Sequence, residues 1–144
     1  MEIFIREIDE NDYPALLTLW QNELGSKYVT AENIAPHYER VKDDERYKTY
    51  VACTEGAVIG FISSVQSYGV GCDGENLQII AMAVKEEYQN KGVGKKLIQR
   101  LEDYARENNF FSIGVCSGFK RTAAHIFYEH SGFEKGSYAF SKIL

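Results

Sequence analysis

The strongest structural signal in the chain is a strand pattern that is followed, after a short turn, by a helix pattern. Residues 77–84, LQIIAMAV, form a nearly continuous apolar run, which is typical of a strand covered on both faces. Beyond Gly92, apolar residues recur at helical spacing as far as about Asn108, at Val93, Leu97, Leu101 and Ala105. Because a strand buried on both faces needs a layer above and below it, this segment predicts an α/β fold.

The rest of the chain predicts further strands and helices around this unit. Strands are expected at about 2–7, 49–54, 57–65 and 110–117, and helices at about 14–24, 30–41 and 121–130. Residues 67–76 hold three glycines without clear periodicity, so we expect a loop there. Tyr138, Phe140 and Ile143 predict a last strand. The resulting order is β-α-α-β-β-β-α-β-α-β, which favours a mixed sheet with helices on both faces.

Composition limits the class of protein. Of the 144 residues, 44% are hydrophobic and 26% charged, so residues 1–144 are expected to form a single domain. The net charge of −5 argues against general nucleic-acid binding, which needs a basic surface. The three cysteines form no CxxC pair, and the three histidines do not lie at ligand spacing from them, so no metal site is expected. Without a leader-like or membrane-spanning run, we expect a cytoplasmic protein with no membrane partner.

The turn that joins the central strand to its helix is the clearest candidate for a binding site. Gly92 and Gly94 allow a ligand to approach the main chain closely, and a helix N-terminus presents unpaired N–H groups that suit phosphate. Three lysines add positive charge: Lys91, Lys95 and Lys96. The spacing alone supports a phosphate site and a solvated lysine cluster equally. The turn does not fit the G-x-G-x-x-G dinucleotide fingerprint, because Leu97 stands at the third glycine position. It does not fit the P-loop either, because Gln89 stands at the first glycine position and Lys96 at the Ser/Thr position.

Two blocks of sequence resemble one known family. The run Gln89-Asn90-Lys91-Gly92-Val93-Gly94 matches the Q/R-x-x-G-x-G/A signature of the GCN5-related N-acetyltransferases (GNAT). Residues 124–134, AHIFYEHSGFE, resemble the A-x-x-x-Y-E-x-x-G-F-E pattern of the same family. The blocks occur in the family's order, and the resemblance covers nearly the whole chain. It implies a GNAT-type mixed, mostly antiparallel central sheet with helices on both faces.

The resemblance implies acetyl-CoA as the acetyl donor, with no metal. The pyrophosphate would sit on the main-chain N–H groups of residues 91–95, and the pantetheine arm would run along residues 82–84 like an added strand. The residues that the resemblance assigns to this cosubstrate are Met82, Ala83, Val84, Gln89, Asn90, Lys91, Gly92, Val93, Gly94 and Lys95.

The resemblance also points to catalytic groups. Tyr128 matches the family's general acid, and a phenol with a pKa of about 10 is protonated at neutral pH. A main-chain N–H near Val84 is the candidate donor to the oxyanion. The base is left open, because Gln78 and Ile80 stand where many members carry a glutamate. Glu75, just upstream, and a chain of water molecules are the two candidates.

The sequence therefore predicts an N-acetyltransferase that moves the acetyl group directly to a primary amine. The acidic balance favours a small-molecule amine as acceptor. A protein N-terminus or lysine as acceptor, a non-catalytic acyl-CoA-binding module and a phosphate-binding protein unrelated to CoA remain as alternatives. The resemblance also allows a homodimer.

Overall fold

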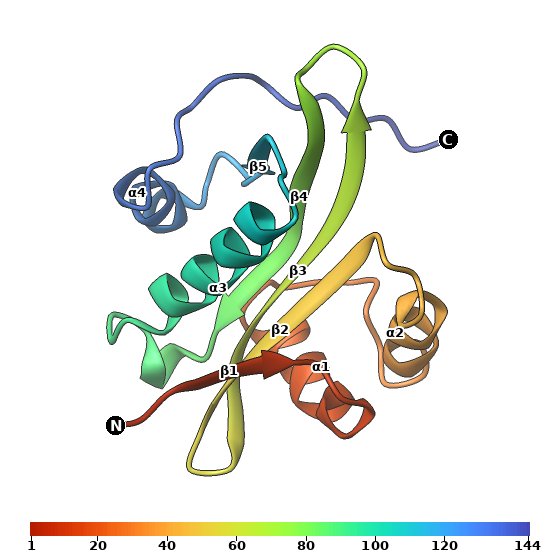
Figure 1. Cartoon of the computed structure of the whole chain (residues 1–144). Helices are drawn as coiled ribbons and strands as arrows, with labels where there is room; N and C mark the ends of the chain where they lie inside the picture. Colours follow the sequence, from red (N-terminus) through yellow and green to blue (C-terminus); the bar gives the residue numbers. More distant parts are fainter.

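The computed structural model describes all 144 residues as one central sheet with helices on both faces (Figure 1). The strands run in the order β1-β2-β3-β4-β5, and every neighbouring pair is antiparallel except β4 and β5, which are parallel. Two short 3₁₀ turns, η1 at Glu10–Asp12 and η2 at Glu86–Tyr88, precede α1 and α3. The strands are β1 Phe4–Glu7, β2 Tyr47–Thr54, β3 Ala57–Gly69, β4 Gly74–Val84 and β5 Ser112–Val115. The helices are α1 Tyr13–Asn22, α2 Ile34–Val41, α3 Val93–Glu107 and α4 Thr122–His130.

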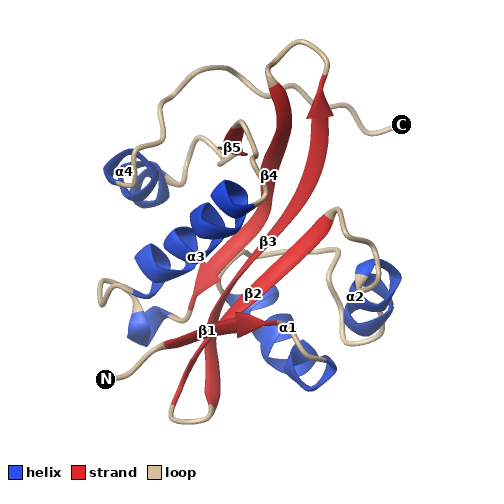
Figure 2. Ribbon diagram, in the orientation of Figure 1, coloured by secondary structure: helices blue, strands red, loops and turns tan.

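The sheet separates two hydrophobic cores. Figure 2 shows α1 and α2 on one side of the sheet and α3 and α4 on the other. On one face, α1 and α2 cover the sheet, with Leu16 of α1 packed in the same cluster as Phe61 of β3. On the other face, Leu97 of α3 packs in a second cluster with Ile62, the next residue of β3. Each of these four side chains has lost all contact with water. Burying one such side chain contributes roughly 1.5–3 kcal/mol, so the two helix layers hold the sheet between them.

The central strand β4 is buried as the sequence predicts. Ala81 and Ala83 face α1 and α2, whereas Met82 between them faces α3. The alternation of side chains along a strand sends successive residues to opposite faces, so an unbroken apolar run supplies both cores. This confirms the strand covered on both faces and the α/β class.

The prediction of a loop at residues 67–76 is wrong. β3 and β4 continue as a hairpin through this stretch, with Tyr68 paired to Glu75 and Gly69 paired to Gly74. Only residues 70–73 lie outside the two strands. This part of the hairpin is largely open to water on both faces, so no apolar alternation marks it in the sequence. Main-chain hydrogen bonds between the two strands maintain the pairing instead.

The predicted last strand is also wrong. No strand follows α4, and Tyr138, Phe140 and Ile143 are 73%, 93% and 90% exposed. None of residues 134–144 makes a main-chain hydrogen bond. Their sequence has strand character, but a strand forms only where another strand edge pairs with it. In Figure 1 this segment leaves α4 and crosses to the far side of the β3–β4 hairpin.

An ion pair between the half-exposed Arg6 and the buried Asp12 joins the first strand to η1, directly before α1. Asp12 is 5% exposed and accepts two hydrogen bonds from Arg6, at 2.7 and 2.9 Å, and one from the main-chain N–H of Asp9 at 2.8 Å. Burial disfavours the charged carboxylate, but the hydrogen bonds from Arg6 and Asp9 outweigh it and lower the pKa of Asp12. Because the pKa of Asp12 is lower in the folded protein than its ordinary value of 3.8, the ionised carboxylate stabilises the fold at pH values above 3.8.

We expect Asp12→Asn to lower the free energy of unfolding at pH 7 by about 1–3 kcal/mol, because charge-assisted hydrogen bonds are lost. The difference between wild type and variant should shrink as the pH falls below about 4, because Asp12 is protonated first in the unfolded chain and then, at lower pH, in the folded protein. Urea denaturation at pH 7 and at pH 3 measures both quantities. An equal difference at the two pH values would contradict the assignment.

No helix of the structure is both long and apolar enough to cross a bilayer. No group of three or more His, Cys, Asp or Glu side chains lies in an arrangement that could hold a metal ion.

Candidate functional site

The pairing of β4 changes at Ile80. Ser63 of β3 pairs with Ala81 and Ser64 pairs with Ile79, so Ile80 has no partner and forms a β-bulge. On the other side of β4, the parallel pairing with β5 covers only residues 76–79. Residues 80–84 therefore have no neighbouring strand on the β5 side, and we refer to them as the open edge of β4. The Val84 carbonyl accepts a hydrogen bond from Gln89, and the other main-chain groups on this side are available to an extended ligand.

The start of α3 lies directly after the open edge in the chain. Gly92 adopts a left-handed conformation, with φ of +85°, and has no side chain to cap the helix. The main-chain N–H groups of Val93, Gly94 and Lys95 donate to no other main-chain group. Unpaired N–H groups and the positive end of the helix dipole together attract anions. The glycine turn predicted from the sequence is therefore present with its donors unused.

Close packing at Gly94 joins β4, α3 and α4. A Cβ atom at this position would lie 3.1 Å from the Cε atom of Met82 and 3.1 Å from the Cζ atom of Phe127. Both contacts are tighter than ordinary van der Waals distances, so only glycine fits without a shift. The second glycine of the motif thus brings α4 and the open edge of β4 together.

Tyr128 of α4 lies within an aromatic group. Its ring centroid is 5.5 Å from that of Phe127 and 5.6 Å from that of Phe133, both in edge-to-face arrangements. Burial raises the pKa of Tyr128 above its usual value, and the positive charge of Arg121 opposes this shift. The phenol is therefore protonated throughout the physiological pH range and can act as a proton donor.

The structure brings most of the predicted site residues into one region. The open edge contains Met82, Ala83 and Val84, and residues 89–95 follow through η2, while α4 carries Tyr128. Glu75 is separate, because it lies near the outer end of the hairpin opposite Tyr68. Five residues of extended strand place it about 16 Å from Ile80.

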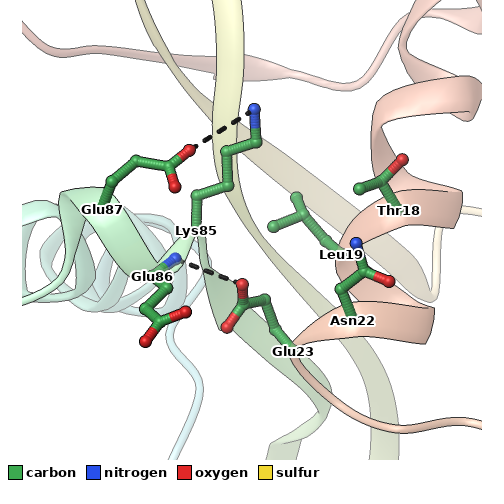
Figure 3. A pocket seen from close by; sticks show the side chains of 7 residues that line it. All are labelled: Thr18, Leu19, Asn22, Glu23, Lys85, Glu86 and Glu87. Atoms are coloured by element: carbon green, nitrogen blue, oxygen red, sulfur yellow. Dashed lines mark hydrogen bonds and ion pairs between the residues drawn. The ribbon is translucent and has the colours of Figure 1, made fainter.

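Gln89 makes contacts that the sequence did not predict. Its side-chain amide donates to the main-chain oxygen of Val84 at 2.9 Å and to Glu23, just beyond α1, at 3.3 Å. The other carboxylate oxygen of Glu23 accepts the main-chain N–H of Glu86 at 3.2 Å, which Figure 3 shows as a dashed line. Gln89 and Glu23 therefore fasten the turn to α1. No sequence signal identifies Glu23, because its partners lie more than sixty residues away.

A polar cleft of about 300 Å³ lies between the end of α1 and the turn (Figure 3). Lys85 and Glu87 form a weak ion pair across its rim, at 3.9 Å. Its lining residues are Thr18, Leu19, Asn22, Glu23, Lys85, Glu86 and Glu87. The cleft lies on the α1 side of the turn, and none of the residues of the open edge lines it.

The family is established by comparison with known proteins. The description "Acetyltransferase (GNAT) family" belongs to a family model that matches residues 6–133. The chain therefore belongs to the GNAT family of acetyltransferases. The fold and the membership implied by the two sequence blocks are confirmed.

Individual relatives match only in part. The chain is 36% identical over 70 residues to the uncharacterized N-acetyltransferase YhdJ of Bacillus subtilis, and the match covers 48% of this chain and 49% of that protein. It is 30% identical over 86 residues to an N-acetylaspartate synthetase of Xenopus tropicalis, and the match covers 59% of this chain and 30% of that protein. The matches thus span less than half the length of either relative.

Solved structures share the fold over the full length. An aminoglycoside acetyltransferase, meta-AAC0020 from an uncultured soil metagenomic sample, solved in complex with sisomicin, superposes with a TM-score of 0.84. The alignment covers 99% of this chain and 96% of that one at 21% sequence identity. At this level of identity the likeness establishes the architecture.

Replacing Glu23 tests the contact between α1 and the turn. We expect Glu23→Ala to speed the hydrogen exchange of main-chain amides in residues 86–92 by about tenfold or more, because two hydrogen bonds that hold the turn are removed. Asn22→Ala is the matched control, since Asn22 lines the same cleft without bonding to the turn. Equal exchange rates in the wild type and the Glu23 variant would show that the turn holds its shape without this contact.

Proposed function

We propose that the protein transfers an acetyl group from acetyl-CoA directly to a primary amine. The observation that carries the proposal is the convergence of the open edge of β4, the uncapped start of α3 and Tyr128. An extended, phosphate-bearing thioester needs these three features together. The family membership supports acetyl transfer as the reaction.

Acetyl-CoA binding is proposed to use mainly the main chain. Residues 82–84 would pair with the amide groups of the pantetheine arm, as a neighbouring strand would. The N–H groups of Val93, Gly94 and Lys95 would hold the pyrophosphate, together with the positive charges of Lys91 and Lys95. A bound anion would also offset the repulsion between these lysines and the positive end of the α3 dipole.

Tyr128 is proposed as the general acid. The amine nitrogen attacks the thioester carbon, and the carbon–sulfur bond breaks as the amide forms. An unpaired N–H of the open edge would stabilise the oxyanion, and the Tyr128 hydroxyl would donate its proton to the leaving sulfur. The raised pKa of Tyr128 keeps this proton in place at neutral pH.

A chain of water molecules is proposed to carry away the proton of the amine. Glu75 lies about 16 Å along β4 from the bulge, too far for direct proton transfer. Gln78 has no basic group, and its amide donates to the Cys116 sulfur at 3.7 Å. Solvent is therefore favoured over Glu75 as the proton acceptor.

A small cationic amine is the proposed acceptor. The net charge of −5 attracts cations, while three lysines, Lys91, Lys95 and Lys96, lie at the turn proposed for the phosphates. The likeness to an aminoglycoside acetyltransferase supports a small-molecule acceptor over a protein. A cytoplasmic location belongs to the same proposal, since all three cysteines are free thiols.

The catalytic role is tested by Tyr128→Phe. We expect kcat for acetyl transfer to fall by about 10²-fold or more, because the leaving thiolate loses its acid, while acetyl-CoA binding changes little. Release of free CoA across a panel of small amines, measured with a thiol reagent, gives the rates. Tyr68→Phe, in the exposed outer hairpin, is the control. Acetyl-CoA binding without turnover of any amine, and without an effect of Tyr128→Phe, would instead indicate a non-catalytic acyl-CoA-binding module.

The cosubstrate site is tested by a pair of glycine variants. Gly92 and Gly56 both have left-handed backbone, with φ of +85° and +77°, and open space around the position of a Cβ. Alanine at either site should therefore cost a similar stability, roughly 1–2 kcal/mol. We expect only Gly92→Ala to raise the Kd for acetyl-CoA, by about tenfold, because Gly56 lies in the distant β2–β3 turn. Calorimetric titration measures the Kd. Equal affinities for acetyl-CoA in the two variants would show that the glycine turn is not part of the binding site.

A further inference from the structure

A buried hydroxyl group without a hydrogen-bond partner lies close to the candidate site. The Oγ atom of Ser117 is shielded from water and makes no hydrogen bond within the chain. It is the only buried side-chain oxygen or nitrogen atom of the protein in this state. An unpaired buried hydroxyl destabilises a folded protein, and native structures rarely retain one. A polar atom of a bound molecule would account for it.

The register of β5 places Ser117 at one end of the gap beside β4. β5 ends at Val115, which pairs with Ile79, the residue before the bulge. Ser117 lies two residues further on, so a continuation of the parallel register brings it level with Ala81, near the start of the open edge. The pyrophosphate is proposed to lie at the opposite end, beyond Val84. The thioester end of acetyl-CoA would therefore lie next to Ser117.

The alternation of side chains places Ser117 on the same face of the sheet as the proposed general acid. Val115 and Tyr128 both pack against the core that α3 covers. Cys116 is exposed, and its sulfur atom accepts a hydrogen bond from Gln78, whose neighbours in β4 point into that same core. Because successive side chains of an extended segment point to opposite faces, Ser117 returns to the face of Val115 and Tyr128.

Contacts on both sides of Ser117 hold it in place. Before it, Cys116 is joined to β4 by the Gln78 amide, at 3.7 Å. After it, the main-chain oxygen of Gly118 accepts a hydrogen bond from the Nε2 atom of His125 in α4, at 2.8 Å. The segment between β5 and α4 is thus anchored to both of the elements that border the gap. Tertiary contacts therefore fix the position of the unpaired hydroxyl.

We propose that the Ser117 hydroxyl donates a hydrogen bond to the carbonyl oxygen of the acetyl thioester. This inference rests on the proposed acetyl transfer. A main-chain N–H of the open edge would reach the same oxygen from the β4 side and Ser117 from the β5 side, and a carbonyl oxygen can accept both bonds. As the amine attacks, negative charge develops on this oxygen, and both bonds become stronger. Ser117 keeps its proton, while Tyr128 supplies the proton that the leaving sulfur takes up.

Ser117→Ala should have opposite effects on stability and on activity. The change removes an unpaired hydroxyl, so we expect the Tm of the ligand-free protein to stay the same or to rise. Thr54→Val is the matched control, because the Thr54 hydroxyl is also buried but donates to the Glu2 carbonyl at 2.7 Å, at the distant end of β2. Removal of this satisfied hydroxyl should lower the Tm by about 3 °C. Thermal unfolding followed by circular dichroism measures both shifts.

Binding and turnover of the same variants test the contact with the thioester. We expect Ser117→Ala to raise the Kd for acetyl-CoA about fivefold and to lower kcat by about 10²-fold. The Kd for free CoA should not change, because its thiol end has no carbonyl oxygen. Thr54→Val should alter neither affinity nor kcat. Calorimetric titration with each ligand gives the Kd values, and release of CoA in the presence of an accepted amine gives kcat.

The outcomes separate this inference from the proposed function. A wild type that does not bind acetyl-CoA would overturn both. If the wild type binds acetyl-CoA, three results would contradict the role of Ser117 alone. One is an unchanged Kd for acetyl-CoA in Ser117→Ala. Another is an equal loss of affinity for acetyl-CoA and CoA, which would assign the hydroxyl to the pantetheine arm. The third is a fall in Tm as large as that of Thr54→Val, which would indicate a structural hydroxyl.

Discussion

The main-chain pairing of β4 is the constraint on which the candidate site depends. From Asn76 to Ile79, β4 is paired on both sides, with β3 and with β5. The bulge at Ile80 shifts the register with β3, and the parallel pairing with β5 stops at the same point. Both faces of the strand stay packed in the two cores while one edge becomes free. A rigid strand thus presents unpaired main-chain groups without losing its support, which is the condition for holding an extended ligand in one conformation.

The elements around this edge are fixed by close packing and by a few polar contacts. Gly94 lets α3, α4 and β4 approach one another within van der Waals distance. Glu23 and Gln89 fasten the turn before α3 to α1, on the opposite face of the sheet. The charge of the chain is also unevenly distributed. The chain is acidic as a whole, yet Lys91, Lys95 and Lys96 lie where the uncapped amides of α3 are. A small anion site in an acidic surface is consistent with a phosphate-bearing cosubstrate and a cationic acceptor.

Patterns that arise from burial could be predicted from the sequence. The apolar run of β4 and the helical spacing of apolar residues in α3 identify both elements. A strand buried on both faces is apolar throughout, and a helix buried along one stripe has apolar residues at a period of about 3.6. The loop predicted at residues 67–76 is wrong, since the outer part of the β3–β4 hairpin is held by main-chain bonds that any side chain permits. The strand predicted around Phe140 is absent, because residues 134–144 pair with no strand edge. Gln89 is predicted to contact the cosubstrate, and the sequence does not reveal that its amide donates to Glu23 and to the Val84 carbonyl.

By itself, the sequence determined the α/β class, the single sheet, the family through two motif blocks, and the glycine turn before α3. These features depend on local conformation and on the periodicity of burial, which neighbouring residues encode together. Only the tertiary structure decided where β4 loses its neighbour, that Glu75 lies far from the bulge, and that Glu23 holds the turn. These depend on strand register and on contacts between distant segments. A shift of one residue would change them without changing any local pattern.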